Sequence, residues 1–323
     1  MHDRKVYLDY TKNPFGLAQI DYSKLLPEAY AYLQSANACF GTPIERLKQM
    51  NLPAVELYAS KGLDISKEYL QIALCAQHNN GGIAVDLWWQ TSVDGLFAAG
   101  ECAGTHGISR PGGSALNAGQ VGSLRAAQYI SAYPGQPVRT DEFDKIAAQA
   151  EEKQKKRLAS ITGDTSNAAA LIAQARRRMS DNASAIRVAD SMQKLQETTL
   201  GELNALENMV SIKDGSEAFL YYKLRDVLVV QGALLGSFLD YREHVGVTRG
   251  SSLYYDPDGN LREGLEEPFR FRTGDSPAST QVQELFFDGQ VFRCQWRAVR
   301  ELPKNADFFE NTWAGYRKNK NIF

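Results

Sequence analysis

The residues best placed to do chemistry lie in one polar, glycine-rich stretch of the chain. Glu101 follows a short apolar run, and Gly112-Gly113 stands directly before Ser114, where a helix is expected to begin. A carboxylate at a strand end can accept hydrogen bonds from ribose hydroxyls. A helix start favours an anionic ligand because its first N–H groups are unpaired. The pattern therefore predicts a nucleotide site; the alternative is a glycine-rich turn that merely packs a helix on a sheet.

Short strands, turns and one helix must position these groups. Residues 80–82, Asn-Gly-Gly, predict a tight turn, and the alternation of apolar residues over 83–87 predicts a strand after it. The apolar run over 95–100, between two glycines, predicts a second, buried strand. A polar loop over 104–113 then leads into the helix. In open α/β folds, ligands bind where such a loop follows a strand.

Three spaced motifs in this stretch resemble one family. In chain order they are His78…Gly81-Gly82-Ile83, Thr91…Gly95-Leu96-Phe97-Ala98-Ala99-Gly100-Glu101 and His106-Gly107…Arg110…Gly112-Gly113-Ser114-Ala115-Leu116. They are similar to the flavoprotein subunits of succinate dehydrogenase and fumarate reductase, to L-aspartate oxidase and to soluble flavin fumarate reductases. The resemblance is strong over residues 78–130 and weaker over 1–77 and 180–250.

The resemblance implies that Arg110 and His78 are catalytic residues that hold a small carboxylate substrate. The family arginine forms a bidentate guanidinium–carboxylate pair, for which arginine is better shaped than lysine. The alternatives are an Arg110 that caps a helix or pairs with Glu101, and a His78 that bonds the backbone. His78 stands one residue closer to Gly81 than in the common family pattern, which leaves open a substrate other than a dicarboxylate. His106 is expected to shape the loop.

The resemblance also implies FAD as the cofactor. Glu101 would hold the FAD ribose, and backbone N–H groups at the helix start would meet the flavin pyrimidine. The helix macrodipole would stabilise negative charge on the reduced flavin. The expected cofactor-binding residues are Gly81, Gly82, Glu101, Gly113, Ser114, Ala115 and Leu116.

The fold class that we predict is α/β plus α, in four parts. They are a capping-domain remnant with a helical lead-in (1–77), the C-terminal part of an FAD-binding Rossmann-type domain (78–137), a helical domain (138–250) and a small β-hairpin-rich C-terminal extension (251–323). Asp-Gly pairs between apolar residues predict hairpins at 252–259 and 285–292. The aromatic tail over 308–316 is expected to pack back on the body, or else to form a partner surface.

Composition excludes several classes of function. The net charge of −2 gives no argument for nucleic acid or for an anionic membrane. No apolar run approaches the ~20 residues of a membrane span, and the first residues lack the apolar core of a signal peptide. The four cysteines stand far apart without a CxxC pair, and there are only four histidines, so we expect free thiols, no metal and a cytoplasmic location.

The sequence contains no GxGxxG, the loop that would cradle the FAD pyrophosphate. We therefore expect the C-terminal portion of an FAD-dependent oxidoreductase, inactive without a partner chain or an N-terminal domain that carries this loop. A homo-oligomer is a further arrangement left open. The alternative is a non-catalytic scaffold or interaction subunit that keeps the fold without a complete active site.

Overall fold

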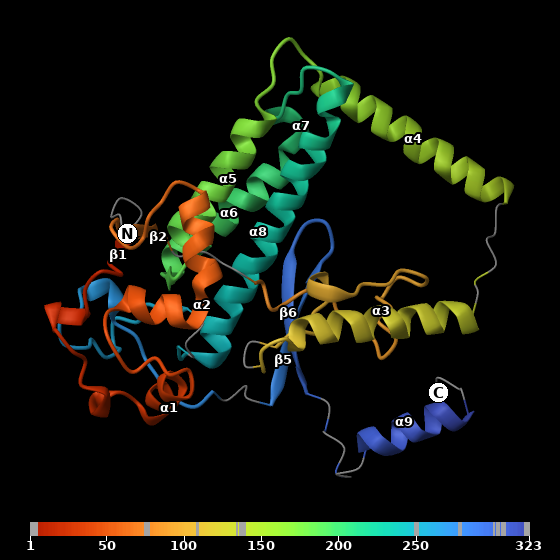
Figure 1. The fold of residues 1–323 in the computed structure, drawn as a ribbon. Coiled ribbons are helices and arrows are strands. Elements are labelled where there is room, and N and C mark those ends of the chain that lie inside the picture. Colours follow the sequence, from red (N-terminus) through yellow and green to blue (C-terminus); the bar gives the residue numbers. More distant parts are fainter. Residues whose placement is uncertain are drawn as a thin grey trace. The chain divides into compact units, whose positions relative to one another are not determined.

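The computed structural model describes residues 6–73, 78–107, 110–133, 135, 140–248, 252–276, 280–299, 301, 304 and 308–319. Helices dominate, and the sheets of the described residues are two-stranded (Figure 1). The mixture of helices with small sheets agrees with the predicted α/β plus α content. Single-turn 3-10 helices span Pro14–Gly16 (η1), Tyr22–Lys24 (η2), Gly100–Cys102 (η3), Gly215–Glu217 (η4) and Glu267–Phe269 (η5).

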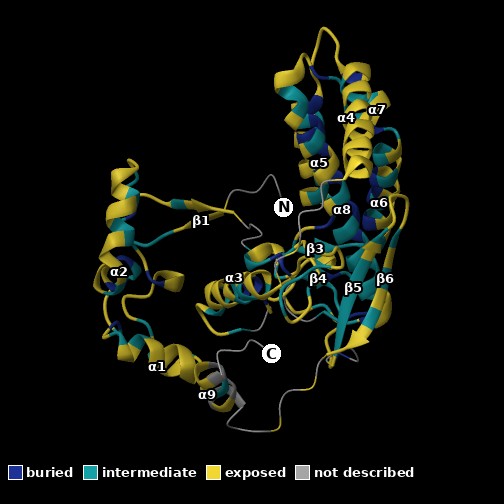
Figure 2. Cartoon of the chain, turned by 90° about the vertical axis from the view of Figure 1, so that its right-hand side faces the viewer, coloured by how far each residue is buried: buried dark blue, intermediate teal, exposed yellow. Residues whose placement is uncertain are grey.

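Three helices pack together and bury an apolar core: α5 (Ala168–Asn182), α6 (Ala189–Asn204) and α8 (Ala218–Val245). Figure 2 shows the buried residues concentrated where these helices meet. Large α8 side chains at helical spacing are 2% exposed or less, and each contributes about 1.5–3 kcal/mol by leaving water. They are Tyr221, Leu224, Leu228 and Leu235. The α8 face is therefore the centre of the bundle.

Two further helices join this bundle: α4 (Asp141–Ile161) and α7 (Leu206–Met209). Ile161 and Leu206 are buried in the same apolar cluster as the residues of α5 and α8. These helices lie within residues 138–250, the range expected to be helical. The loops between them are not helical, and residues 186–187 form a strand.

That strand, β3 (Ile186–Arg187), pairs in parallel with β4 (Leu253–Tyr254). The hairpin predicted at 252–259 is therefore wrong. A turn does form at Asp256, whose carbonyl accepts from the Gly259 N–H at 3.0 Å. Beyond the turn only one antiparallel bridge follows in the described residues, between Asn260 and Phe271. One edge of β4 pairs with β3, and on the other edge the Tyr254 N–H donates to the Thr248 hydroxyl at 3.0 Å.

The hairpin predicted at 285–292 is confirmed. β5 (Gln281–Phe287) pairs antiparallel with β6 (Phe292–Ala298). The rings of Phe287 and Phe292 stack at the turn, with their centroids 4.2 Å apart. The Asp288 carboxylate accepts from the Val291 N–H at 2.8 Å and closes the loop.

The hairpin is fastened to α8 by close packing and by a carboxylate. A methyl group on Gly232 would lie 2.4 Å from the Phe292 ring, and one on Gly236 would lie 3.2 Å from Leu285. The Asp240 carboxylate accepts from the Trp296 indole N–H at 2.7 Å, and from the Gln283 side-chain amide at the same distance. Small residues on α8 thus admit the aromatic hairpin.

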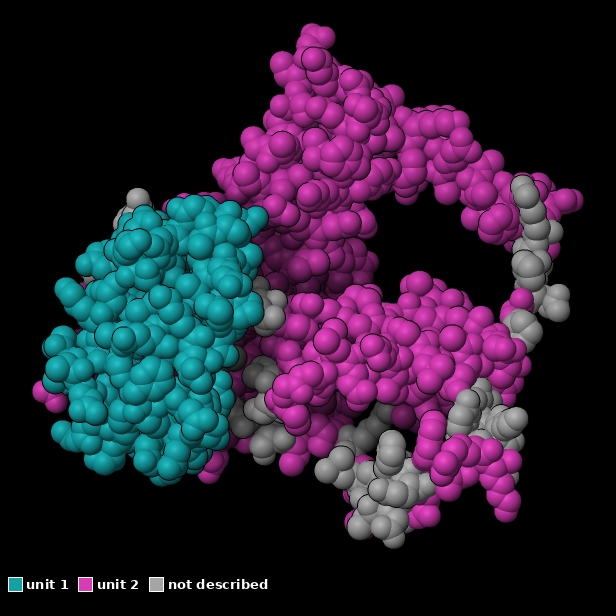
Figure 3. Space-filling view, viewed as in Figure 1, with its two compact units in different colours: residues 1–76 teal, residues 77–323 magenta. Residues whose placement is uncertain are grey.

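The chain divides into two compact units, residues 1–76 and 77–323, coloured separately in Figure 3. In the first unit β1 (Val6–Leu8) pairs antiparallel with β2 (Leu70–Ile72), and the helices are α1 (Pro27–Ser35) and α2 (Pro43–Ser60). The first helical position of α2 is Pro43, where a proline is well tolerated because that N–H has no intrahelical acceptor. The four-part domain division remains a prediction.

Arg46 on α2 ties together the loops of the first unit. Its guanidinium, in a residue only 9% exposed, donates to the Gly41 carbonyl at 2.7 Å and to the Asn13 side-chain oxygen at 3.0 Å. A buried guanidinium is tolerated only when it is bonded in this way.

The end of the chain forms α9 (Phe308–Asn319). Trp313 is 48% exposed, and the side chains of Phe308, Phe309 and Tyr316 lie outside the described residues, so the role of the aromatic tail stays a prediction. Within the described part of the chain, no helix combines the length and the apolar character that crossing a membrane requires.

Candidate functional site

The segment from 78 to 133 contains irregular backbone and one long helix, α3 (Ser114–Ala132). The helix starts at the residue predicted. The two strands predicted at 83–87 and 95–100 are wrong, because each region makes only one isolated bridge among the described residues: Ile83 with Ala103, and Gln90 with Phe97. A strand needs a continuous ladder of paired backbone groups, and in the described part of the chain these two regions have no neighbouring strand to supply one.

A close backbone crossing joins the turn at Gly82 to the segment that follows Glu101. The Ile83 N–H donates to the Cys102 carbonyl at 2.8 Å, and the Gly104 N–H donates to the Ile83 carbonyl at 2.9 Å. A Cβ on Gly82 would lie 2.5 Å from the Cys102 oxygen, so only glycine fits. Gly81 has open space beside it. The crossing brings residues far apart in sequence to one place.

His78, His106 and Glu101 meet beside this crossing. The Nε2 atom of His78 lies 3.0 Å from Nδ1 of His106 and 3.7 Å from a carboxylate oxygen of Glu101. The other Glu101 oxygen accepts from the Asn79 N–H at 3.3 Å. Both imidazoles are largely buried: the His78 side chain is 10% exposed and His106 is 7% exposed. The structure therefore brings together the predicted residues His78 and Glu101, with His106 as a third member.

Asn80 connects Arg110 to this group. The Arg110 Nη1 donates to the Asn80 side-chain oxygen and to the Gly107 carbonyl. The Asn80 N–H in turn donates to His78 Nδ1 at 2.9 Å. Asn80 has a φ of 59°, a left-handed conformation that asparagine tolerates better than most residues. The alternative of a backbone-bonded His78 is thus observed, in a site that also holds Arg110.

We call His78, Asn80, Glu101, His106 and Arg110 the polar cluster. Sequence reasoning missed the roles of two of its members, Asn80 and His106. The sequence did offer a signal for His106, because it is a second histidine in the same glycine-rich stretch as His78. For Asn80 no sequence signal separated a turn residue from a side chain that bonds an arginine.

The start of α3 carries the remaining predicted cofactor residues. Gly113 caps the helix with a φ of 78°, and the Ser114 hydroxyl is buried without a partner among the described residues. Ala115 is partly buried, whereas Leu116 is 78% exposed. The first N–H groups of a helix have no intrahelical acceptor. This end of α3 therefore offers N–H donors, an unpaired hydroxyl and an exposed apolar side chain.

The middle of α3 packs on η3 and on an aromatic side chain. A Cβ on Gly119 would lie 3.4 Å from the Gly100 Cα, next to Glu101, so the turn with the predicted ribose ligand rests on this helix. The Arg125 guanidinium lies over the Trp88 ring, 4.1 Å from its centroid, and donates to the Leu87 carbonyl. Burial lowers the pKa of Arg125.

These features fit one end of FAD. The positions Gly81, Gly100, Gly112 and Gly113 have nothing within 4 Å of an added Cβ, which leaves their backbone open to a planar ring. The Ser114 hydroxyl and the helix N–H groups are donors for ring carbonyls, and Glu101 is an acceptor for ribose. A GxGxxG loop for the pyrophosphate is not present in the sequence.

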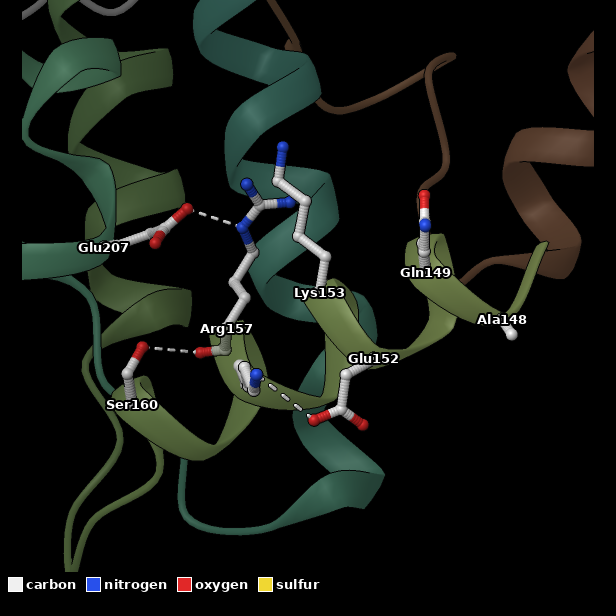
Figure 4. Close-up of a pocket in the computed structure, with 8 residues that line it drawn as sticks. Ala148, Gln149, Glu152, Lys153, Arg157, Ser160 and Glu207 are labelled. Carbon is white, nitrogen blue, oxygen red and sulfur yellow. Dashed lines mark hydrogen bonds and ion pairs between the residues drawn. The ribbon is translucent and has the colours of Figure 1, made fainter. Parts of the chain in front are cut away.

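A separate cavity of about 810 Å³ lies on the helical part, over α4 and Glu207 (Figure 4). Its charges are largely paired: Arg157 Nε lies 2.5 Å from Glu207, and Lys156 lies 3.4 Å from Glu152. This pairing is typical of a solvated helix face. None of the predicted site residues lines it.

Comparison with known proteins supports the flavin assignment. Residues 5–116 match the family model of an FAD binding domain. An uncharacterised FAD-dependent oxidoreductase of Methanocaldococcus jannaschii is 30% identical over 187 residues, 57% of this chain and 34% of that protein. One subunit of the CoM/CoB fumarate reductase of Methanothermobacter marburgensis is 41% identical over 83 residues, 25% of this chain and 14% of that protein. The L-aspartate oxidase of Clostridium perfringens is 41% identical over 75 residues, 23% of this chain and 17% of that protein.

Solved structures share the fold. A quinol-fumarate reductase with menaquinol superposes with a TM-score of 0.62 at 20% identity, over 93% of this chain and 56% of that chain. Mycobacterium smegmatis Sdh1 superposes with a TM-score of 0.57 at 18% identity, over 98% of this chain and 54% of that chain. The chain thus spans about half the length of these structures and about a third or less of the curated relatives above.

These matches confirm the resemblance seen in the sequence. The chain is similar to succinate dehydrogenase and fumarate reductase flavoproteins in part of its sequence and in its fold. The expected cofactor, FAD, is confirmed through the matched FAD-binding domain.

Proposed function

We propose that this chain supplies the flavin-facing and carboxylate-binding part of an FAD-dependent oxidoreductase that transfers hydride between flavin and a small carboxylate. The observation that carries the proposal is the polar cluster. In it, Asn80 connects Arg110 to His78, which lies between His106 and Glu101, all within the segment that matches an FAD-binding domain. FAD, when bound, supplies the hydride acceptor or donor. The protein residues bind and orient the substrate.

Arg110 is suited to hold a carboxylate. Its contacts with the described residues use Nη1, which leaves the edge formed by Nη2 and Nε for two parallel bonds to a carboxylate. Asn80 and the Gly107 carbonyl fix the guanidinium in place before a ligand arrives. Such preorganisation reduces the free energy spent on ordering the side chain during binding.

Glu101 would accept from the ribose hydroxyls, and the N–H groups of Ala115 and Leu116 would meet the pyrimidine carbonyls. The Ser114 N–H already donates to the Pro111 carbonyl at 3.3 Å, so Ser114 would contribute its hydroxyl. Gly81 and Gly113 leave the nearby backbone open to the flavin, whereas the space beside Gly82 is filled by the Cys102 backbone, so Gly82 would act by allowing the crossing. We propose that the pyrophosphate is held by a glycine-rich loop from an N-terminal segment or a partner chain, since this sequence has no GxGxxG. A cytoplasmic location remains part of the proposal.

The test begins with the visible absorption spectrum of the purified full chain, alone and with added FAD, followed by titration with malonate as an unreactive dicarboxylate. We expect flavin uptake and a saturable change of the flavin bands. Arg110→Lys removes the bidentate pair and should weaken malonate binding by about 10- to 150-fold, corresponding to about 1.5–3 kcal/mol for a hydrogen bond to a charged group.

The control is Arg177→Ala. Arg177 is an exposed arginine on α5 that pairs with Asp181, so its loss should leave FAD uptake and malonate binding unchanged. A chain that takes up FAD while malonate changes neither its flavin bands nor those of Arg110→Lys would contradict the proposal. That result would favour the non-catalytic scaffold instead.

A further inference from the structure

His106 holds a hydrogen-bond donor that the described residues do not use. The residue is 7% exposed, and its Nε2 atom is buried without a partner among them. Buried polar atoms are nearly always paired, and an exception points to a ligand, a water molecule or a catalytic role. The His106 ring is therefore the member of the polar cluster with unused bonding capacity.

The protons on the two rings follow from the bonds around them. His78 Nδ1 accepts from the Asn80 N–H at 2.9 Å, so this nitrogen carries no proton. A neutral His78 then carries its proton on Nε2, which lies 3.0 Å from His106 Nδ1. His106 Nδ1 must accept this proton, which leaves the His106 proton on Nε2. A chain of two bonds, from Asn80 to His78 to His106, thus fixes the tautomer of the second ring.

His78 is the less suitable ring for contact with a ligand. Its Nδ1 is occupied by the backbone of Asn80, and its Nε2 faces both His106 and the Glu101 carboxylate, 3.7 Å away. A second carboxylate at this nitrogen would have to displace His106 and would lie close to Glu101, with a like charge. The free donor of His106 has no such competitor among the described residues.

We propose that His106 donates its Nε2–H to an oxygen of the bound small carboxylate, and that His78 is the positioning residue that holds His106 in the donor tautomer. The inference rests on the proposed function and changes the roles of the two histidines. His106, expected to shape the loop, becomes the ligand contact, and His78, expected to bind substrate, acts through it. Arg110 and His106 would then bind the same ligand from two sides of Asn80.

The first test reads the tautomer directly. The full chain is labelled with ¹⁵N-histidine, and long-range ¹H–¹⁵N correlations are recorded at pH 8, where free imidazole is neutral. There are only four histidines, so the His106 signals are assigned by their loss in His106→Asn. We expect His106 as the Nε2–H tautomer in the wild type and in His78→Gln, whose amide can still donate. His78→Asn, which lacks a donor at that point, should give a mixture.

The second test measures ligand affinity by calorimetry with malonate. His106→Gln keeps an N–H near the Nε2 position, whereas His106→Asn removes it. We expect His106→Asn to weaken binding about tenfold or more, and His106→Gln to restore most of the affinity. The fold is checked by the retained His78 signals in each variant.

The outcomes separate the two proposals. A wild-type His106 in the Nδ1–H tautomer overturns the inference without any variant. So does an unchanged malonate affinity in His106→Asn when Arg110→Lys loses affinity, and in that case the proposed function stands. A wild type that takes up FAD but shows no malonate binding overturns the proposed function, and the inference falls with it.

Discussion

Replacing Gly82 by alanine should loosen the crossing that assembles the polar cluster. The added methyl would lie 2.5 Å from the Cys102 oxygen and 2.6 Å from the Ala103 carbonyl carbon. Both are backbone atoms, which cannot swing aside as a flexible side chain could. The two segments must therefore move apart, and the bonds between Ile83, Cys102 and Gly104 must lengthen.

Overpacking of this kind costs about 1–3 kcal/mol. The matched control is Gly81→Ala, one residue earlier, where an added Cβ meets nothing within 4 Å. A surface substitution of that type usually changes stability by less than about 0.5 kcal/mol. The two variants thus add the same methyl group, but only Gly82→Ala is expected to lower stability.

Amide hydrogen exchange is the appropriate assay, because a chain of two compact units has no single two-state unfolding free energy. At 1.4 kcal/mol for each factor of ten, Gly82→Ala should lower the protection of the Ile83 and Gly104 amides by about 5- to 150-fold. Protection in α8 serves as the internal reference. Equal protection of the two amides in both variants would refute the packing argument.

Three other predictions concern the helical bundle and the β5–β6 hairpin. Arg178→Ala removes a half-buried ion pair in which the guanidinium donates two hydrogen bonds to Glu202, at 2.5 and 2.6 Å. It should lower the protection of the α5 and α6 amides against hydrogen exchange by about 1–3 kcal/mol. The exposed neighbour Arg177→Ala is the control and should change this protection by less than about 0.5 kcal/mol. Burial raises the pKa of the Cys294 thiol from 9.0 to about 11, so alkylation by iodoacetamide should be slow at pH 8 and accelerate toward pH 11. Because the folded state favours the neutral thiol, its contribution to stability is complete below pH 9 and declines as the pH rises through 11, and Cys294→Ala should flatten this decline in thermal melts. Asp240→Ala leaves two donors of the hairpin unpaired and should shift the indole NMR signal of Trp296; an unmoved signal would argue against the bond.

Local signals in the sequence predicted the elements that are stabilised locally. The helical domain expected over 138–250 contains α8, and Asp288-Gly289 between aromatic residues predicted the β5–β6 turn. The β3–β4 pair was missed, because a two-residue parallel pairing between Ile186 and Leu253 leaves no pattern within either segment. The alternation over 83–87 suggested a strand, but a strand forms only where a partner is present.

The candidate site shows the same division. The glycine-rich loop, the helix start and the residues His78, Glu101 and Arg110 could be chosen from the sequence and its resemblance to a family. The bonds between them could not, since the contact between His78 and His106 joins positions 28 residues apart. The turn at Asn80 and the backbone crossing at Gly82 determine that the ring nitrogens of His78 and His106 bond as they do and that His106 Nε2 has no partner among the described residues.

The packing of the Phe292 ring, from β6, against Gly232 of α8 limits which substitutions the two positions can accept. Gly232 leaves room for the ring, so a larger residue there collides with it, and a smaller residue at 292 opens a void above the helix. Neither change is tolerated easily alone, yet the two together restore the volume. Among related chains, positions 232 and 292 should therefore change as a pair, and a double substitution should regain stability that each single one loses.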